Sequence, residues 1–351
     1  RIPSLDGLRA ASILLVIVSH LSLPIPVLAQ VDYGNLGVRI FFVISGFLIT
    51  ALLLGERETT GHISIRCFYA RRFFRIVPAY YTFLLVMALL IPSGWIRASF
   101  AGLLPAATFS MNYVPVTATL VHSWSLSVEE QFYLLWPGAL VLLGLRRSMY
   151  GCVTLLFTAP IFRELSMAGL WPTPAVTAFE SVCDALAVGC LLAILREQLW
   201  SKAHYRACVS SPYVLLIPAV ALACMAIEPT STIVRTLSLS MLNIGIALSM
   251  DRYMRFPQSI VGRALNLAPI VWIGTISYSL YLWQQPLMFN TLHLQWYVKI
   301  AGCFACGAAS FYWVERPGLA LRRSLSGDLD RSADTLGARM SCRSRTIRKH
   351  L

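Results

Sequence analysis

Long apolar segments recur along the chain and are separated by short stretches that are polar and mostly basic. A helix needs about 20 apolar residues to cross the hydrocarbon core of a bilayer. The pattern therefore indicates an all-α fold, a polytopic integral membrane helix bundle with both termini on the same side. We predict ten spans, at residues 5–23, 35–54, 74–91, 126–144, 148–162, 182–195, 213–227, 232–250, 268–289 and 296–314.

One further apolar stretch, residues 98–111, is shorter than the others and contains Pro105. A short apolar run that proline interrupts is typical of segments that enter a membrane without crossing it. We expect a re-entrant or interfacial segment here.

Arginine and lysine accumulate in the loops that follow the second, fourth, sixth and eighth predicted spans, and in the C-terminal tail. Cytoplasmic loops of membrane proteins carry such an excess of positive charge. Both termini are therefore predicted to be cytoplasmic. We assign residues 1–317 to the membrane domain and expect residues 318–351, which are basic and lack apolar periodicity, to form a disordered cytoplasmic tail.

Composition excludes several other classes of protein. With 57% hydrophobic and 13% charged residues, the chain is too apolar for a soluble domain of its length. The net charge of +13 does not indicate nucleic-acid binding, because the basic residues form short clusters between apolar runs. The nine cysteines contain one C-x-x-C pair, Cys303 and Cys306, with no second pair or nearby histidine, so we expect no metal site.

The first predicted span carries two ionisable side chains, Arg9 and His20, in the stretch RIPSLDGLRAASILLVIVSHL. About three helical turns separate them, so both point to the same face, roughly 16 Å apart along the axis. An ionisable group at this depth is costly and marks a pathway or an active site. The alternative is that Arg9 reaches the helix end and His20 bonds a neighbouring helix.

The second predicted span contains three glycines and one serine in GNLGVRIFFVISGFLIT. Glycines in membrane helices let their neighbours approach closely, and we assign Gly34, Gly37 and Gly46 to packing. The hydroxyl group of Ser45 could take part in a binding or catalytic pocket. The chain has no G-x-S-x-G motif, however, so the sequence does not support a serine hydrolase.

Three arginines stand at the cytoplasmic entry of the third predicted span, in FYARRFFRIVPAYY. Arginines at such a position commonly set the orientation of a span. Arg72 and Arg75 are also three residues apart and share a helical face, and two guanidinium groups so placed can bind one phosphate. Both interpretations stay open for Arg71, Arg72 and Arg75.

The segment HSWSLSVEEQFYLLWP, residues 122–137, opens the fourth predicted span with two carboxylates. Ser127 and Glu130 have the spacing of a helix-capping box, which gives Glu130 a structural role. Glu129 is left without one, and a buried carboxylate needs a partner. We therefore predict that Glu129 lies beside His20 and orients it as a general base.

Six motifs in this order resemble acyltransferase family 3, a family of membrane O-acyltransferases. They extend from residue 2 to residue 317 and are RIPSLDGLRAASILLVIVSHL, GVRIFFVISGFLIT, ARRFFRIVPAYY, HSWSLSVEEQFYLLWP, ISYSLYLW and WVERP. The resemblance implies an enzyme of the bacterial inner membrane that transfers an acyl group, most often acetyl from acetyl-CoA, to a hydroxyl of an envelope carbohydrate or another small acceptor. It also implies that Arg9 and His20, Arg72 and Arg75, and Glu129 are functional.

The chain departs from the family pattern at two places. The family often has histidine where this chain has Gln284, so a proton-transfer role at that position does not carry over. The family also often has arginine two residues before the aspartate of the sixth span. Val182 stands there, before Asp184, so the polar pair around Asp184 is expected to differ.

These observations lead to one mechanism and two alternatives. In the mechanism, Arg9, Arg72 and Arg75 bind the phosphates of acyl-CoA, and His20, oriented by Glu129, deprotonates the acceptor hydroxyl. Direct attack on the thioester and a covalent acyl-enzyme both stay open. A transporter or flippase would instead move a solute without forming an ester. A structural scaffold would leave the buried ionisable groups unexplained.

Overall fold

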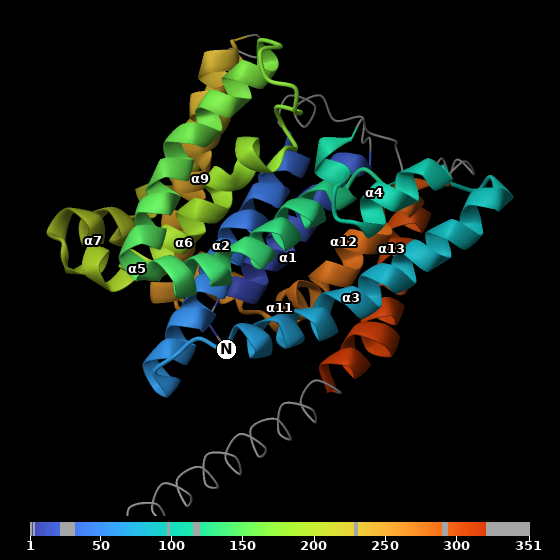
Figure 1. Cartoon of the computed structure of the whole chain (residues 1–351), viewed down its shortest axis with the longest axis horizontal. Helices are drawn as coiled ribbons and strands as arrows, with labels where there is room; N and C mark the ends of the chain where they lie inside the picture. The colour runs from blue at the N-terminus through green and yellow to red at the C-terminus, as the bar shows by residue number, and fades with distance from the viewer. Residues whose placement is uncertain are drawn as a thin grey trace, which may run out of the picture.

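The structure, a computed structural model, describes residues 2, 4–21, 32–96, 99–114, 120–227, 231–289 and 294–320 of the 351-residue chain. Within these residues the fold is helical and contains no β-strand, so the predicted all-α class is confirmed (Figure 1). Most of the expected tail, from residue 321 onward, lies outside the described residues. The α-helices are α1 (Leu5–His20), α2 (Tyr33–Thr60), α3 (Ile65–Leu90), α4 (Leu103–Ala107), α5 (Ser123–Met167), α6 (Phe179–Ser201), α7 (Ala203–Ser210), α8 (Leu216–Ile227), α9 (Thr232–Arg255), α10 (Ile260–Leu265), α11 (Ala268–Thr275), α12 (Ser277–Met288) and α13 (Trp296–Ser310).

Each of the ten predicted spans overlaps at least one of these helices. Five segments of the described chain form helices long and apolar enough to cross a membrane, and a sixth is a pair bent by 79°. The count of ten crossings and the cytoplasmic position of both termini therefore stay predictions. The five are Tyr33–Thr60, Ile65–Ser93, Ser123–Met167, Thr232–Arg255 and Trp296–Ala320, and the bent pair is Ala203–Ser210 with Pro212–Ile227.

The predicted fourth and fifth spans are the two arms of α5, which breaks at Gly144. The backbone there has φ 76° and ψ 167°, a conformation that glycine alone adopts readily. The hydroxyl of Ser148 donates to the carbonyl oxygen of Ala139 at 3.0 Å, across the break. The chain beyond Gly144 thus lies against the turn before it, and α5 reverses its direction.

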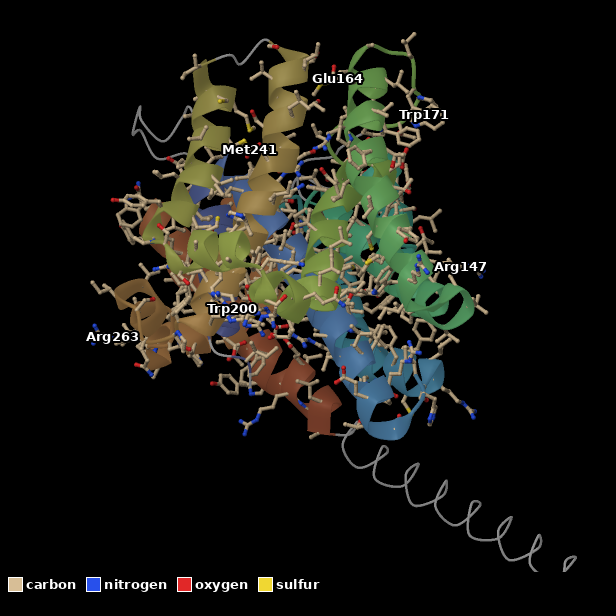
Figure 2. All side chains as sticks on the ribbon, turned by 90° about the vertical axis from the view of Figure 1, so that its left-hand side faces the viewer. Arg147, Glu164, Trp171, Trp200, Met241 and Arg263 are labelled. Carbon is tan, nitrogen blue, oxygen red and sulfur yellow. The ribbon has the colours of Figure 1, made fainter. Side chains whose placement is uncertain are left out.

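Loops that the charge pattern places on one side of the membrane lie at one end of the bundle. Figure 2 shows Glu164 and Trp171 at one end, and Trp200 and Arg263 towards the other. Glu164 and Trp171 lie in or near a loop that the charge pattern predicts to be outside. Trp200 and Arg263 lie in or near loops that it predicts to be cytoplasmic. The order of crossings itself stays a prediction.

Helices α1 and α2 lie side by side in the centre of the bundle, and α6 packs on the other side of α2 (Figure 1). Small residues make this approach possible. A Cβ atom at Gly46 would overlap the carbonyl oxygen of Leu186, and one at Gly189 would overlap that of Val43. The predicted packing role of Gly46 is confirmed. The close packing at Gly46 also fixes the position of Ser45, the residue directly before it in the chain.

Residues 99–113 form only short helices, at Phe100–Gly102, α4 and Met111–Tyr113, as predicted for a segment that does not cross the membrane. The hydroxyl of Tyr80 on α3 donates to the carbonyl oxygen of Ala106 at 2.9 Å. At the end of the segment, burial and the Glu180 carboxylate raise the pKa of Tyr113 to about 12. The Tyr113 hydroxyl therefore stays protonated and donates to Glu180 at 3.0 Å.

Candidate active site

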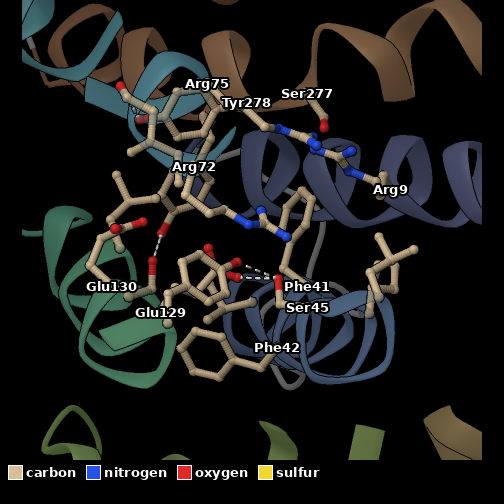
Figure 3. Close-up of a pocket in the computed structure, with 18 of the residues that line it drawn as sticks. Arg9, Phe41, Phe42, Ser45, Arg72, Arg75, Glu129, Glu130, Ser277 and Tyr278 are labelled. Atoms are coloured by element: carbon tan, nitrogen blue, oxygen red, sulfur yellow. Dashed lines mark hydrogen bonds between the residues drawn. The ribbon is translucent and has the colours of Figure 1, made fainter. Parts of the chain in front are cut away.

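Side chains from α1, α2, α3, α5 and α12 converge on a cavity of about 170 Å³, which we call the inner cavity (Figure 3). It collects most of the ionisable residues that the sequence singled out. Its polar and ionisable lining residues are Arg9, Ser45, Arg72, Arg75, Ser125, Glu129, Glu130, Tyr133, Ser277, Tyr278 and Tyr281.

Three guanidinium groups face this cavity. Arg72 and Arg75 share one face of α3, as their spacing predicts, and the Arg72 guanidinium lies 4.7 Å from the ring centre of Tyr133. Arg75 lies beside Arg9 of α1, and the two groups repel each other (Figure 3). Arg71 instead forms an ion pair with Glu56 at 2.6 Å. Arg71 therefore has a structural partner outside the inner cavity, whereas Arg72 and Arg75 line the cavity.

Glu129 lies in the inner cavity with the arginines and bonds to α2. The Ser45 hydroxyl donates to Glu129 Oε1 at 2.6 Å, and the Tyr133 hydroxyl donates to Ser45 Oγ at 3.1 Å (Figure 3). Glu129 also attracts Arg72, Arg9 and Arg75 electrostatically. The partners of the buried Glu129 carboxylate are thus Ser45 and the three arginines.

The predicted capping box of Ser127 and Glu130 is wrong. Helix α5 begins at Ser123, five residues earlier than the box requires, so Ser127 is already inside the helix and donates to the Ser123 carbonyl oxygen at 2.9 Å. Glu130 is thereby released from a structural role. It lines the inner cavity and attracts Arg72 electrostatically.

The predicted contact between His20 and Glu129 is also wrong. His20 lies in a second cavity of about 360 Å³, the outer cavity, together with His122. His122 directly precedes α5 and lies at the level of His20, whereas Glu129 follows seven residues later, about 10 Å further along the helix. Arg9 and His20 therefore face different cavities at the two ends of α1.

The outer cavity contains a second histidine that the sequence analysis did not select. His122 is 2% exposed, and its Nδ1 lies 2.8 Å from Gln285 Oε1. Gln284, the residue that replaces the usual histidine of the family, lies beside His20. The sequence feature that could have indicated His122 is its position as the first residue of the motif HSWSLSVEEQFYLLWP.

The other polar and ionisable residues of the outer cavity are Ser19, Asp32, Asn35, Trp124, Thr177, Arg235 and Tyr281.

Glu315 is a second residue that the sequence analysis did not select. It ends a π-helical turn, Phe311–Glu315, is 2% exposed, and accepts a hydrogen bond from Ser279 at 3.0 Å. It attracts Arg75 and Arg9 electrostatically. The motif WVERP contained this carboxylate, next to a predicted span. A buried ionisable group at this depth is costly and marks a functional region.

The expected difference around Asp184 is found. Its partner arginines come from other helices, Arg163 of α5 at 2.6 Å and Arg39 of α2 at 4.0 Å. The hydroxyl of Ser240 on α9 also donates to Asp184 at 2.9 Å. The cluster therefore joins α2, α5, α6 and α9, and neither cavity includes Asp184.

The fold and the site define a class of protein: a helical protein with apolar helices long enough to cross a membrane, one cavity lined by three arginines and a separate cavity with two histidines. The chain belongs to acyltransferase family 3, because residues 2–314 match the family model, which is described as an acyltransferase domain. The resemblance that the motifs indicated is confirmed.

Three curated relatives are similar over most of this chain. They are the putative peptidoglycan O-acetyltransferase YrhL of Bacillus subtilis (26% identical), the peptidoglycan O-acetyltransferase OatA of Listeria monocytogenes (27%) and the O-acetyltransferase OatA of Staphylococcus aureus (28%). The matches cover 90%, 90% and 85% of this chain, and 54%, 55% and 53% of the relatives. The chain thus spans about half the length of these relatives. No solved structure matches it.

Proposed function

We propose that this protein is an integral membrane O-acetyltransferase of the bacterial inner membrane. It transfers the acetyl group of acetyl-CoA to a hydroxyl of peptidoglycan, another envelope carbohydrate or a small hydroxylated molecule. The names of all three relatives support acetyl transfer, and those of the Bacillus subtilis and Listeria monocytogenes relatives support peptidoglycan as the acceptor. The observation that carries the proposal is the pair of cavities at the two ends of α1, one with three arginines and one with two histidines.

The inner cavity is the donor site of this proposal. Arg9, Arg72 and Arg75 face it, and guanidinium groups bind phosphate oxygens in a bidentate geometry. The phosphates of acetyl-CoA bind there from the cytoplasm. The pantetheine arm extends along α1, over the rise of roughly 16 Å between Arg9 and His20.

The outer cavity is the acceptor site. His20 removes the proton of the acceptor hydroxyl, and the oxygen attacks the carbonyl carbon of the thioester. A C–O bond forms and the C–S bond breaks, and the proton passes from His20 to the CoA thiolate, so the reaction needs no further reactant. Gln284 lies beside His20. Trp124 offers the flat apolar face on which a sugar ring packs.

Direct attack is favoured over an acyl-enzyme. Ser45 and Glu129, at 2.6 Å, have the geometry of a nucleophile beside a base, so Ser45 is the candidate carrier in a two-step route. An acetyl group on Ser45 would lie in the inner cavity, however, whereas His20 lies in the outer one. Glu129 then serves to hold Ser45 and to balance the arginine charges.

The test is mass spectrometry of envelope glycans from cells supplied with isotopically labelled acetate. The cells express the wild type, His20→Ala or an empty vector, and immunoblots match the amounts of protein. We expect a base-labile labelled ester with the wild type alone. A change in solute distribution without any ester would instead favour a transporter.

A further inference from the structure

The inner and outer cavities have two lining residues in common, Val38 of α2 and Tyr281 of α12. All other residues of the two linings belong to one cavity alone. Both shared side chains are buried, Val38 at 6% exposure and Tyr281 at 5%. These two side chains are therefore the wall where the cavities meet.

Hydrogen bonds hold the Tyr281 ring across this wall. Its hydroxyl lies 2.6 Å from Ser125 Oγ and 3.1 Å from the carbonyl oxygen of His122, and Ser125 Oγ also lies 3.1 Å from that oxygen. The two hydroxyl protons satisfy this triangle, one towards His122 and one between the hydroxyls. The Tyr281 hydroxyl is thus fully engaged in hydrogen bonds to Ser125 and His122.

The ring itself packs between residues of the two sides. The Phe41 ring, on the inner side, is 6.1 Å from it at 77°, and the His122 ring, on the outer side, is 5.5 Å from it at 57°. Phe41 lines the inner cavity and His122 the outer. The Tyr281 ring is therefore packed on both sides at the place where the two cavities meet.

We infer that Tyr281, opposite Val38, separates the donor cavity from the acceptor cavity and determines which acyl groups reach the acceptor. The inference rests on the proposed function, in which the thioester carbon must come within reach of the acceptor oxygen near His20. The bonds formed and broken are those given above: C–O forms, C–S breaks, and the acceptor proton ends on the CoA thiol. Tyr281 takes no part in this exchange and acts as a specificity-determining residue.

Two properties of the reaction follow from such a wall. A two-carbon acyl group needs a smaller displacement of the ring than a longer chain, so the wall favours acetyl over butyryl donors. The wall also keeps water of the outer cavity from the thioester while no acceptor is bound, which limits hydrolysis.

The experiment measures acyl transfer and hydrolysis with acetyl-CoA and butyryl-CoA, in membranes that contain the full chain. Ester is quantified by mass spectrometry, and CoA thiol released without ester is quantified with a thiol reagent. The variants are Tyr281→Ala, Tyr281→Phe, Val38→Ala and Val38→Phe. Leu280→Ala is the matched control, because Leu280 is a fully buried neighbour on α12 that lines neither cavity.

We expect Tyr281→Ala and Val38→Ala to raise the butyryl-to-acetyl ratio about tenfold and to increase hydrolysis, since a missing group in an apolar pocket changes selectivity by about that factor. Val38→Phe should lower the ratio. Tyr281→Phe keeps the ring and should keep the ratio within about twofold of the wild type. Leu280→Ala should leave the ratio unchanged even if less protein accumulates.

The outcomes distinguish this inference from the proposed function. If the wild type transfers acetyl and the ratio stays constant in the Tyr281→Ala and both Val38 variants, the wall does not determine selectivity and the inference is wrong. If Leu280→Ala changes the ratio as much as Tyr281→Ala does, general loosening of α12 is the cause, and the inference is again wrong. If the wild type forms no ester with either donor, the proposed function itself fails.

Discussion

Arg71 and Arg72 are neighbours in the sequence, but their side chains meet different partners, and this difference tests the donor site. We predict that Arg72→Ala raises the KM for acetyl-CoA about 10-fold to 100-fold and changes kcat less, because a hydrogen bond to a charged group contributes about 1.5–3 kcal/mol. Arg71→Ala should leave this KM unchanged, since Arg71 pairs with Glu56 outside the cavity. Initial rates at varied acetyl-CoA, with protein matched by immunoblot, give both constants. Equal effects of the two variants would show that the arginines act only on orientation in the membrane.

Ser45 distinguishes direct transfer from an acyl-enzyme. Direct transfer predicts that Ser45→Ala keeps measurable activity and lowers it about tenfold, because Glu129 loses a hydrogen bond to a charged group. Incubation of the wild type with labelled acetyl-CoA and no acceptor should then leave no label on the protein. A labelled ester on the peptide that contains Ser45, absent from Ser45→Ala, would establish the two-step route in its place.

The position of a residue along its helix axis was the feature of the site that the sequence predicted least well. Helical spacing placed Arg72 and Arg75 on one face, and the structure agrees. The predicted pairing of His20 with Glu129 failed because it depended on where α5 starts, and the assumed capping box put that start five residues too late. His122 and Glu315 were missed because their burial depends on contacts between distant helices, which no local pattern reveals.

At the scale of an element, Gly144 tests whether α5 must reverse. Gly144→Ala places a Cβ on a backbone with positive φ, and such strain costs about 1–3 kcal/mol. We predict a lower midpoint of thermal unfolding in detergent. Gly138→Ala is the control: this glycine lies within the helix, nothing is near the added Cβ, and alanine favours a helix by up to about 1 kcal/mol. If both substitutions shift the midpoint in the same direction and by the same amount, the break at Gly144 is not required.

The positions of the helices were largely predictable, but their breaks were not. Apolar runs predicted a helix in every one of the ten ranges. They could not predict that one range divides at Ile276 into α11 and α12, or that two ranges are joined through Gly144. Such breaks depend on the backbone conformation of single residues. The arginines around Asp184 were likewise beyond local patterns, because α2 and α5 supply them.

At the scale of the whole molecule, the proposed assignment of a donor cavity and an acceptor cavity requires the predicted orientation of the bundle, with the arginines nearer the cytoplasm. Single cysteines in a cysteine-free background test this orientation in intact cells. A cysteine at Gly61, between α2 and α3, should react with a membrane-impermeant maleimide only after permeabilisation. A cysteine at Gly169, between α5 and α6, should react from outside. Both positions are open, with nothing near an added Cβ, and both have positive φ, so the two substitutions carry similar backbone strain. The reverse pattern would place His20 on the cytoplasmic side, and the acceptor would then have to be a cytoplasmic molecule.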